Sequence, residues 1–349
     1  MFTFNRSAWW QRGTIALLIA VPFFAFGQSL LQGYAPIDDL FVVVRNLATR
    51  GPTWDHIRTA FTTFDPELYI PATLVSFQLN YVVSGLNPWS YHLVNVLLHS
   101  MNAVLLFLIL KKVTQAPRAA LFVAALFAVH PMNTEAVVWI TARKDLLSTF
   151  FAFASALAFL RQTQRGVLLS IVLFLLALLA KVSVAPLPLV LPLLLTAQGK
   201  KWDRRTLLGV LPLLVLSAAF VGLALFGKQR IVETSNLIET LLLIPRSTLF
   251  LLGTFLVPGN LSPLYEVTDP IALTNPWIAA SLVGFLGLIG IFCFLRHRLR
   301  GAFLSLWIFL ILLAPAFLTF RKAGTDFLVS DRYIYLPSHG LLLLLTLML

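Results

Sequence analysis

The residues of this chain best suited to chemistry are charged side chains that follow apolar segments. Asp38 and Asp39 are adjacent and lie within a few residues of the end of a long apolar run. A positioned carboxylate can act as a general base toward a hydroxyl group. Adjacent carboxylates also repel each other, which would raise the pKa of one of them toward a useful value. Asp38 and Asp39 are therefore candidate catalytic residues.

A cationic group lies near the other end of the chain. Arg332 is followed by Tyr333 and Tyr335 just before the last apolar run. A guanidinium offers a planar fork of donors that suits phosphate oxygens, and it stays charged in a partly desolvated site. Arg332 and Tyr333 are thus candidates for binding a donor phosphate. The alternative is an interfacial tyrosine belt with a neighbouring arginine.

Lys181 is a second candidate phosphate ligand. It follows a run of Leu and Ala and precedes Val182-Ser183-Val184, so it caps a tight turn between two helices. A lysine at such a place commonly extends its ammonium group to the membrane surface, and this explanation stays open beside phosphate binding.

The segment from His130 to Asp145 contains a third polar group. Glu135 and Asp145 are separated by ten positions, with Arg143 and Lys144 between them. A short hairpin of this kind can present an acid, a base and a polar cluster to the mouth of a cavity. His130, Glu135, Arg143 and Asp145 are therefore expected to contact the substrate or to fix the basic residues. Arg143 and Asp145 could instead anchor helix ends at the lipid headgroups.

Several classes of site are not indicated by the sequence. A P-loop and a glycine fingerprint after a strand are both missing, which argues against ATP or NAD chemistry. The single cysteine, Cys293, lies in an apolar segment and cannot form an intramolecular disulfide. His-x-x-His and Cys-rich metal spacings are also missing, so no metal or other cofactor is expected, although carboxylates from separate loops could converge on a divalent cation.

The elements that must position these residues are transmembrane helices. The chain is 59% hydrophobic and only 11% charged, and apolar runs recur along its whole length. A spanning helix needs about 20 mainly apolar residues. This pattern predicts an all-α polytopic membrane protein with about nine to eleven transmembrane helices. The segments expected to span are roughly 13–32, 91–110, 119–132, 146–160, 167–180, 182–198, 206–226, 277–295 and 302–319.

Two further apolar runs and the first segment are ambiguous. The stretch 241–257, which contains Pro245 and Arg246, could cross the bilayer, re-enter it or lie in the interface. The last run, from Gly340 to Leu349, has about half the length of a span, so we expect an incomplete last helix and a chain that is truncated. Arg6 and Arg12 before the first apolar segment would also suit a cleavable signal peptide, but the later segments need the first one for packing.

The distribution of Lys and Arg gives an orientation. If the N-terminus is cytoplasmic and the nine segments cross in turn, fourteen of the 26 basic residues and one acid, Asp203, fall on the cytoplasmic side. The other side then holds the remaining thirteen of the 14 acids and every candidate site residue. This arrangement satisfies the positive-inside rule. The high content of basic residues thus reflects topology and anionic lipid rather than nucleic acid, for which no binding module is recognisable.

The first non-cytoplasmic loop, about residues 33–90, is expected to be ordered. Trp54, Ile57, Phe61 and Phe64 recur at helical spacing, with Thr53 as an N-cap. This pattern is typical of an amphipathic helix in the membrane interface. A helix packed on other loops would give the same pattern.

Taken in order along the chain, these segments resemble a known family. The Asp38-Asp39 pair, the segments Asn87 to His99 and His130 to Asp145, Ala180-Lys181 and the segment Asp331 to Ser338 are similar to the bacterial relatives of the transmembrane and tetratricopeptide-repeat-containing O-mannosyltransferases, within the GT-C glycosyltransferase superfamily. The resemblance covers essentially all of the chain, which would then form a single GT-C-like transmembrane domain over residues 1–349.

The resemblance implies an enzyme in the bacterial inner membrane that transfers a sugar from a polyprenyl-phosphate carrier to an acceptor on the non-cytoplasmic face. Asp38 and Asp39 match the acidic pair that looks catalytic in this family, and Arg332-Tyr333 matches its Arg-Tyr segment. The family implies a hexose, of which mannose is the best known in this family, and inversion at the anomeric carbon follows from direct displacement by the acceptor. The acceptor class, whether protein, lipid or glycan, stays open.

The chain departs from the family pattern at two positions. Relatives commonly carry Lys-Glu where this chain has Lys181-Val182, and often Tyr-Arg-Pro-Leu where it has Tyr69-Ile70-Pro71-Ala72. These departures put donor specificity in doubt, and the tetratricopeptide repeats are also absent from the sequence. A transporter or flippase of lipid-linked sugars is the alternative function, although the charges gather in loops rather than near the bilayer midplane.

Overall fold

Helices account for almost all of the regular structure, as the long apolar runs predict. The computed structural model describes residues 6–36, 38–65, 68–228, 237–318, 320–322 and 325–349. The α-helices are α1 (Arg6–Phe26), α2 (Trp54–Thr62), α3 (Pro71–Ser84), α4 (Pro88–Thr114), α5 (Pro117–Val129), α6 (Thr134–Val138), α7 (Arg143–Phe159), α8 (Gln164–Ala180), α9 (Leu187–Ala197), α10 (Arg204–Lys228), α11 (Leu237–Leu256), α12 (Pro276–Phe294), α13 (Arg300–Leu313) and α14 (Ser338–Met348).

Short 3-10 or π turns and three small strands connect these helices. The turns are η1 (Gly27–Leu31), η2 (Leu40–Val44), η3 (Leu47–Thr49), η4 (Pro131–Asn133), η5 (Ile140–Ala142), η6 (Val182–Val184), η7 (Ala314–Leu318) and η8 (Asp331–Ile334). Strands β1 (Tyr265–Glu266), β2 (Arg321–Lys322) and β3 (Thr325–Val329) form an antiparallel sheet in the order β1-β3-β2. The expected all-α class is thus confirmed, with one small sheet added.

Six helical segments of the described chain are long and apolar enough to cross a membrane. They are Trp10–Leu31, Pro88–Thr114, Arg204–Gly227, Leu237–Leu256, Pro276–Phe294 and Arg300–Leu318. A seventh span arises if Pro117–Val129 and Pro131–Val138, which are bent by 52° at a break, are counted as one. Three shorter apolar helices, Gln164–Ala180, Val182–Ala197 and Ser338–Met348, add to these. The described chain thus has six or seven candidate spans, fewer than the nine to eleven expected from the sequence, because several of the predicted segments form helices too short to be counted as spans.

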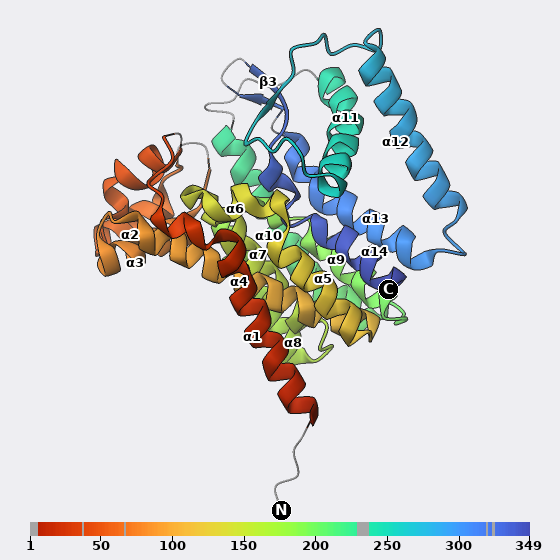
Figure 1. The fold of residues 1–349 in the computed structure, drawn as a ribbon, viewed down its shortest axis with the longest axis horizontal. Helices are drawn as coiled ribbons and strands as arrows, with labels where there is room; N and C mark the ends of the chain where they lie inside the picture. The colour runs from red at the N-terminus through yellow and green to blue at the C-terminus, as the bar shows by residue number, and fades with distance from the viewer. Residues whose placement is uncertain (1–5, 37, 66–67, 229–236, 319, 323–324) are drawn as a thin grey trace, which may run out of the picture.

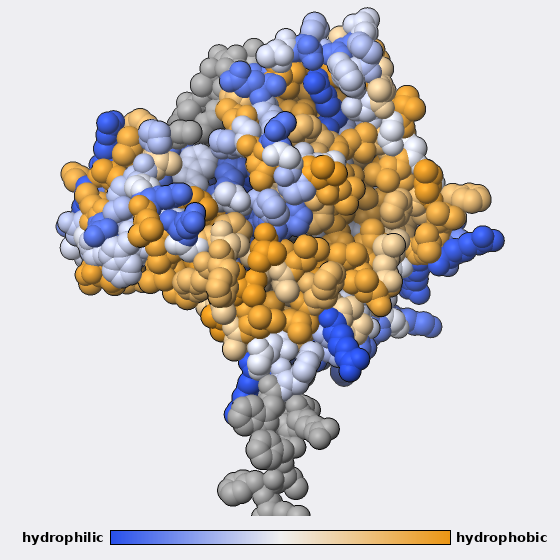
Figure 2. Space-filling model, in the orientation of Figure 1, coloured by the Kyte–Doolittle hydropathy of each residue, from blue (hydrophilic) through white to orange (hydrophobic). Residues whose placement is uncertain are grey.

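The surface of the molecule is divided as a bilayer would require. Figure 2 shows a broad apolar band across the visible face, with polar residues at the upper end and again at the lower end. The N-terminal end of α1 lies at the lower end in this view, and the small sheet lies at the upper end (Figure 1). The end with the sheet is therefore the one to which the sequence assigns the site.

Helix α4 forms the centre of the bundle. It is 27 residues long, begins at Pro88 and is capped by Asn87, whose side chain accepts a hydrogen bond from Trp89 N. A proline is favourable at the first helical position because its missing N–H would have no partner there. The buried face of α4 packs against α1, α5 and α7 in the largest hydrophobic cluster. This buried helix supplies a rigid support for the outer loops.

The described residues of the loop 33–90 form helices and turns, as the sequence predicts. Thr53 Oγ1 accepts a hydrogen bond from His56 N at 3.2 Å and caps α2. Trp54 is 78% exposed and Phe61 is 44% exposed on this helix. Exposed aromatic side chains beside an apolar belt favour the interfacial interpretation of α2. The following segment forms α3, a further helix that the sequence analysis did not single out.

The ambiguous segment 241–257 forms most of α11, a helix of 20 residues. Arg246, in the middle of the helix, pairs with Asp269 at 3.6 Å. Ser247 Oγ donates a hydrogen bond to Leu328 O of β3 at 2.9 Å. The middle of α11 thus lies beside elements that the sequence places on the outer face.

The last apolar run forms α14, a helix of 11 residues that packs against α13. At Gly340 the two helices approach closely: a Cβ atom added to Gly340 would lie 2.5 Å from Phe309 N and 2.7 Å from Ser305 O. Only a glycine allows this separation between the two backbones. This contact fixes the position of α14 directly after η8, where Arg332 lies.

Candidate active site

The two adjacent aspartates have different surroundings. Asp39 is 1% exposed, and its Oδ2 and Oδ1 accept hydrogen bonds from Ala35 N and Thr141 N, both at 2.9 Å. Burial raises the pKa of Asp39, although these two hydrogen bonds lower it. The sequence analysis expected repulsion between the aspartates to raise one pKa, whereas burial is the main cause in the structure. Asp39 joins the first outer loop to the segment before α7.

Asp38 is more accessible and pairs with a lysine. Its side chain is 27% exposed, and its Oδ2 lies 3.7 Å from Lys144 Nζ. Since both oxygens of Asp39 are bound to backbone amides, Asp38 is the carboxylate of the pair that is better placed to accept a proton from a substrate. Lys144 belongs to the segment from His130 to Asp145, but the sequence does not mark it as a site residue.

Lys181 pairs with Asp145. The Lys181 ammonium is within hydrogen-bond distance of Asp145 Oδ1, and both side chains are nearly buried. Burial lowers the pKa of Lys181, while the Asp145 carboxylate raises it. The other oxygen of Asp145, Oδ2, is buried and has no hydrogen-bond partner among the described residues.

Arg332 pairs with Glu135 in the same region. Arg332 Nη1 donates to Glu135 Oε1 at 2.7 Å, and Arg332 N donates to Oε2 at 2.8 Å. Ser330 Oγ lies 2.9 Å from both carboxylate oxygens. The guanidinium also lies over the Trp139 ring, 4.6 Å from its centroid. Burial by itself would lower the pKa of Arg332, but Glu135 and other nearby anions raise it above its usual value.

Tyr333 connects the two predicted phosphate ligands. Lys181 Nζ lies 5.8 Å from the centroid of its ring, and Arg332 Cζ lies 5.6 Å from the same centroid. The structure therefore brings together two cations that are 151 positions apart in the sequence. Asp145 and Asp38 also act electrostatically on Arg332. Three ion pairs, Asp38–Lys144, Asp145–Lys181 and Glu135–Arg332, thus form one cluster.

Buried polar contacts hold this cluster in place. Tyr335, three residues after Arg332, is bound through its OH by His99 Nδ1 at 2.7 Å and by Asn102 Nδ2 at 3.1 Å, both from α4. Thr73 Oγ1 of α3 donates to Ala180 O, directly before Lys181, at 3.0 Å. These contacts attach η8 to α4 and the end of α8 to α3. They fix the backbone positions from which Arg332 and Lys181 extend.

Arg143 lies apart from the cluster. Its guanidinium is fully buried and donates to Asn95 Oδ1 at 2.9 Å, to Tyr91 O at 2.7 Å and to Asn80 Oδ1. It also lies 4.6 Å from the centroid of the Phe77 ring. Arg143 therefore joins α3, α4 and α7, and it does not anchor a helix end at the lipid headgroups.

His130 also lies apart from the cluster. Its Nδ1 accepts a hydrogen bond from Met132 N at 3.3 Å, and its ring stacks on Phe255 of α11 at 4.5 Å. It occupies the break between α5 and η4. In the described part of the chain, His130 makes no contact with the three ion pairs.

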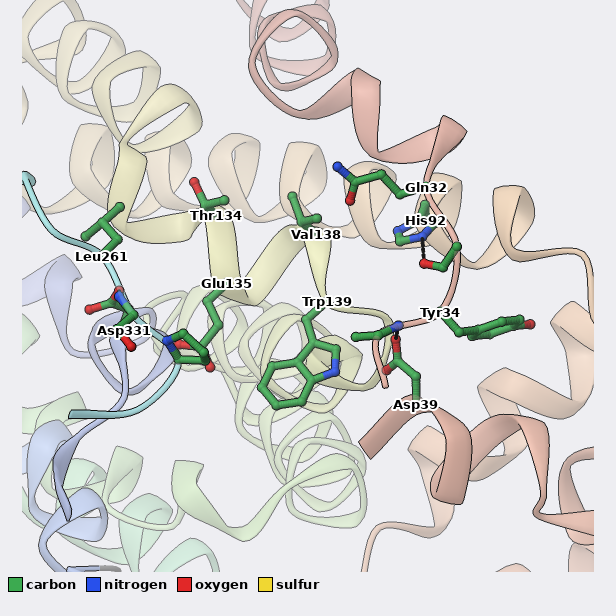
Figure 3. A pocket seen from close by; sticks show the side chains of 14 residues that line it. Gln32, Tyr34, Asp39, His92, Thr134, Glu135, Val138, Trp139, Leu261 and Asp331 are labelled. Carbon is green, nitrogen blue, oxygen red and sulfur yellow. Dashed lines mark hydrogen bonds between the residues drawn. The ribbon is translucent and has the colours of Figure 1, made fainter. Parts of the chain in front are cut away.

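A cavity of about 400 Å³ lies next to the cluster. Figure 3 shows Glu135 and Asp331 toward one end of it and Asp39 toward the other, with the Trp139 indole between them. Its lining contains three carboxylates and no Lys or Arg among the described residues. His92 Nδ1 and Trp139 Nε1, both from lining residues, are buried without a hydrogen-bond partner in the described chain.

Sequence reasoning missed Lys144 and Trp139. Lys144 directly precedes Asp145, and Trp139 lies in the same segment, so both were in view as parts of a polar hairpin. The segment forms η4, α6 and η5 instead of a simple hairpin, and these turns decide which side chains face the cluster. No group of three or more His, Cys, Asp or Glu side chains suited to a metal ion occurs among the described residues.

Comparisons with known proteins point to O-mannosyl-transferases. The chain is 33% identical over 164 residues to protein O-mannosyl-transferase TMTC1 of Mus musculus, which covers 44% of this chain and 17% of that protein. It is 33% identical over 157 residues to TMTC3 of Homo sapiens and 44% identical over 94 residues to TMTC2 of Homo sapiens. The matched regions thus span about a sixth of these relatives or less. No family model and no solved structure matches the chain.

Proposed function

We propose that the protein is an inverting glycosyltransferase of the GT-C type, which moves a hexose from a polyprenyl-phosphate carrier to an acceptor hydroxyl. The convergence of Lys181 and Arg332 on the Tyr333 ring carries the proposal. Two nearly buried cations beside a candidate base form a site for a phosphate that gains negative charge as its sugar leaves. The names of the relatives support a sugar transfer, and those relatives are named for mannose and for protein acceptors.

In this mechanism Asp38 takes the proton of the acceptor hydroxyl. The acceptor oxygen attacks the anomeric carbon, and the bond from that carbon to the phosphate oxygen breaks. The released lipid phosphate is bound by Arg332 and Lys181. Asp39 holds the first outer loop in place and thereby orients Asp38. Because a lipid phosphate is a good leaving group, the proposed reaction needs no metal ion.

The acceptor enters through the cavity lined by Asp39, Glu135, Asp331 and Trp139, and its reacting hydroxyl extends beyond this lining to Asp38, the neighbour of Asp39 in the chain. The carboxylates of the lining would repel a phosphate, so the cavity suits a neutral or positively charged molecule with a hydroxyl group. A polypeptide segment that contains Ser or Thr fits this description. The donor phosphate thus binds at the cations Lys181 and Arg332, whereas the acceptor binds in a cavity lined by carboxylates.

The lipid chain of the donor lies in an apolar groove of about 410 Å³ between α2, α3, α7 and α8. Nine of its ten lining residues are apolar, and Ser76 is the exception. Leu179 and Leu147 of the lining each lie two positions from a member of the Lys181–Asp145 pair. The groove is thus close along α8 and α7 to a proposed phosphate ligand, and an apolar groove of this kind suits the chain of a polyprenyl phosphate.

The proposed site lies on the non-cytoplasmic face of a bacterial inner membrane. The positive-inside distribution of basic residues supports this orientation. A transporter of lipid-linked sugars would need the same lipid groove. The carboxylate beside the cations favours covalent transfer, because translocation alone requires no base.

The test uses purified protein in proteoliposomes with radiolabelled polyprenyl-phosphate sugars and an envelope extract as the acceptor. Transfer of label by the wild-type protein and not by Asp38→Asn is the expected result, and it would also identify the sugar. Movement of intact labelled lipid between leaflets without any transfer would replace the proposal with the transporter function.

A further inference from the structure

Lys144 is a basic residue of the cluster that the mechanism above does not use. It lies at the start of α7 and is 6% exposed. Its Nζ is 3.7 Å from Asp38 Oδ2, and no hydrogen bond to this ammonium is found in the part of the chain that the structure describes. Lys181 and Arg332, in contrast, are each hydrogen-bonded to their carboxylate partners. Lys144 is therefore the most loosely held of the three cations.

The charges around Lys144 come from both halves of the proposed reaction. Arg332 and Lys181, the proposed phosphate ligands, act on it, as do Asp38 and Asp145. Arg143, its neighbour in the sequence, is bound to α3 and α4 and fixes the first turn of α7. The Lys144 ammonium thus lies beside the candidate base and close enough to both proposed phosphate ligands to interact with their charges.

We propose that Lys144 is a third phosphate ligand, which pairs with Asp38 before the reaction and with the released lipid phosphate after it. This inference rests on the proposed function. As Asp38 accepts the acceptor proton, its charge changes from minus one to zero. The electrons of the broken sugar–oxygen bond stay on the phosphate, whose charge changes from minus one to minus two. The negative charge that faces Lys144 thus moves from Asp38 to the released phosphate.

Because of this exchange, Lys144 contributes more to binding of the lipid phosphate product than to binding of the donor. While the donor phosphate is a singly charged diester, Lys144 stays close to Asp38. When the phosphate becomes a doubly charged monoester, Lys144 stabilises it. The same preference lowers the energy of the transition state, in which the new charge is already developing.

The test measures the binding of two probes in detergent at pH 8 by calorimetry. Farnesyl phosphate is largely doubly charged at this pH, since the second pKa of a phosphate monoester is about 6, and its methyl diester carries a single charge. We expect Lys144→Met to weaken binding of farnesyl phosphate about tenfold or more and to weaken binding of the diester much less. Lys144→Arg is expected to retain most of the affinity, and Lys200→Met, which changes an exposed lysine, serves as the matched control.

Three outcomes would overturn the inference. Unchanged binding of both probes by Lys144→Met would exclude Lys144 as a phosphate ligand, and an equal loss for both probes would assign it a structural role only. In either case the wild-type protein would still bind, so the proposed function would stand. Failure of the wild-type protein to bind either probe would overturn both this inference and the proposed donor class.

Discussion

Arg332 is bound to Glu135 at two points, because its Nη1 donates to Oε1 at 2.7 Å and its backbone N–H donates to Oε2 at 2.8 Å. The carboxylate thus fixes both the direction of the guanidinium and the backbone of η8 from which it extends. A phosphate ligand held in this way loses little conformational freedom when the donor binds.

Removal of the Glu135 carboxylate should destabilise the protein. Glu135→Ala leaves the nearly buried Arg332 cation without its partner, which typically costs about 3–5 kcal/mol. Glu135→Gln should cost less because the amide oxygen can still accept a hydrogen bond. Thermal unfolding in detergent measures the difference. The control variant is Glu266→Ala, because Glu266 is exposed. Equal melting temperatures for Glu135→Ala and wild type would show that the pair does not stabilise η8.

Asp38→Asn should leave the fold intact and abolish transfer. The Asp38 side chain is partly exposed, and the amide oxygen of an asparagine can still face the ammonium of Lys144, so the nearly buried lysine keeps a polar partner. Loss of a general base lowers a rate about 100- to 10,000-fold. The rate of sugar transfer in proteoliposomes is the measurement, and Asp55→Asn in the same outer loop is the matched control. An active Asp38→Asn protein would contradict the assignment of the base.

Donor binding should depend on pH through Lys181. Burial lowers the pKa of this lysine, so it loses its proton at a lower pH than an ordinary lysine, whose pKa is about 10.4. Affinity for a lipid phosphate should therefore fall as the pH rises toward that value. Lys181→Arg should retain more of its affinity over the same range because arginine stays protonated, and the remaining fall is expected from Lys144, whose pKa burial also lowers. Identical alkaline profiles for the two proteins would exclude Lys181 from phosphate binding.

Arg143→Lys should lower the free energy of unfolding and have a smaller effect on the rate of sugar transfer. The guanidinium hydrogen-bonds to two asparagine side chains and to a backbone carbonyl, and a lysine cannot reach all three in the same geometry. We expect a loss of about 2–4 kcal/mol in the free energy of unfolding. Arg161→Lys, at an exposed position, is the control. If the two variants unfold at the same temperature, the central role of Arg143 is wrong.

A methyl group at Gly340 should separate α13 from α14. The added Cβ would lie within 3 Å of backbone atoms of Phe309 and Ser305, so one of the helices must shift. Gly290→Ala is the matched control, since no atom lies within 4 Å of a Cβ at that helical position and alanine there is expected to stabilise the helix by about 1 kcal/mol. Opposite shifts in melting temperature are the expected result, and shifts of the same sign would contradict the close approach.

The membrane helices could largely be predicted from the sequence, whereas their ends and bends could not. Apolar length decides whether a helix forms, and the run 91–110 accordingly lies within α4. The run 119–132 was expected to be continuous, but the chain ends α5 at Val129 and bends at His130. Pro131 disfavours helical geometry at the residue before it, and the stacking of His130 on Phe255 holds the bend. That second contact depends on a helix more than 100 positions away.

The sequence by itself determined which residues are available for chemistry and that long apolar helices carry them, because side-chain type and the length of an apolar run can be read from each segment alone. Only the tertiary structure decided which of them meet. Asp38 and Asp39 are neighbours in the chain, yet one binds Lys144 and the other binds backbone amides. Lys181 and Arg332 are distant in the chain and lie over the same tyrosine ring. These pairings depend on how the buried helices pack, because packing places the end of one helix beside the end of another. The packing depends on residues from several segments, so no single segment predicts the pairings.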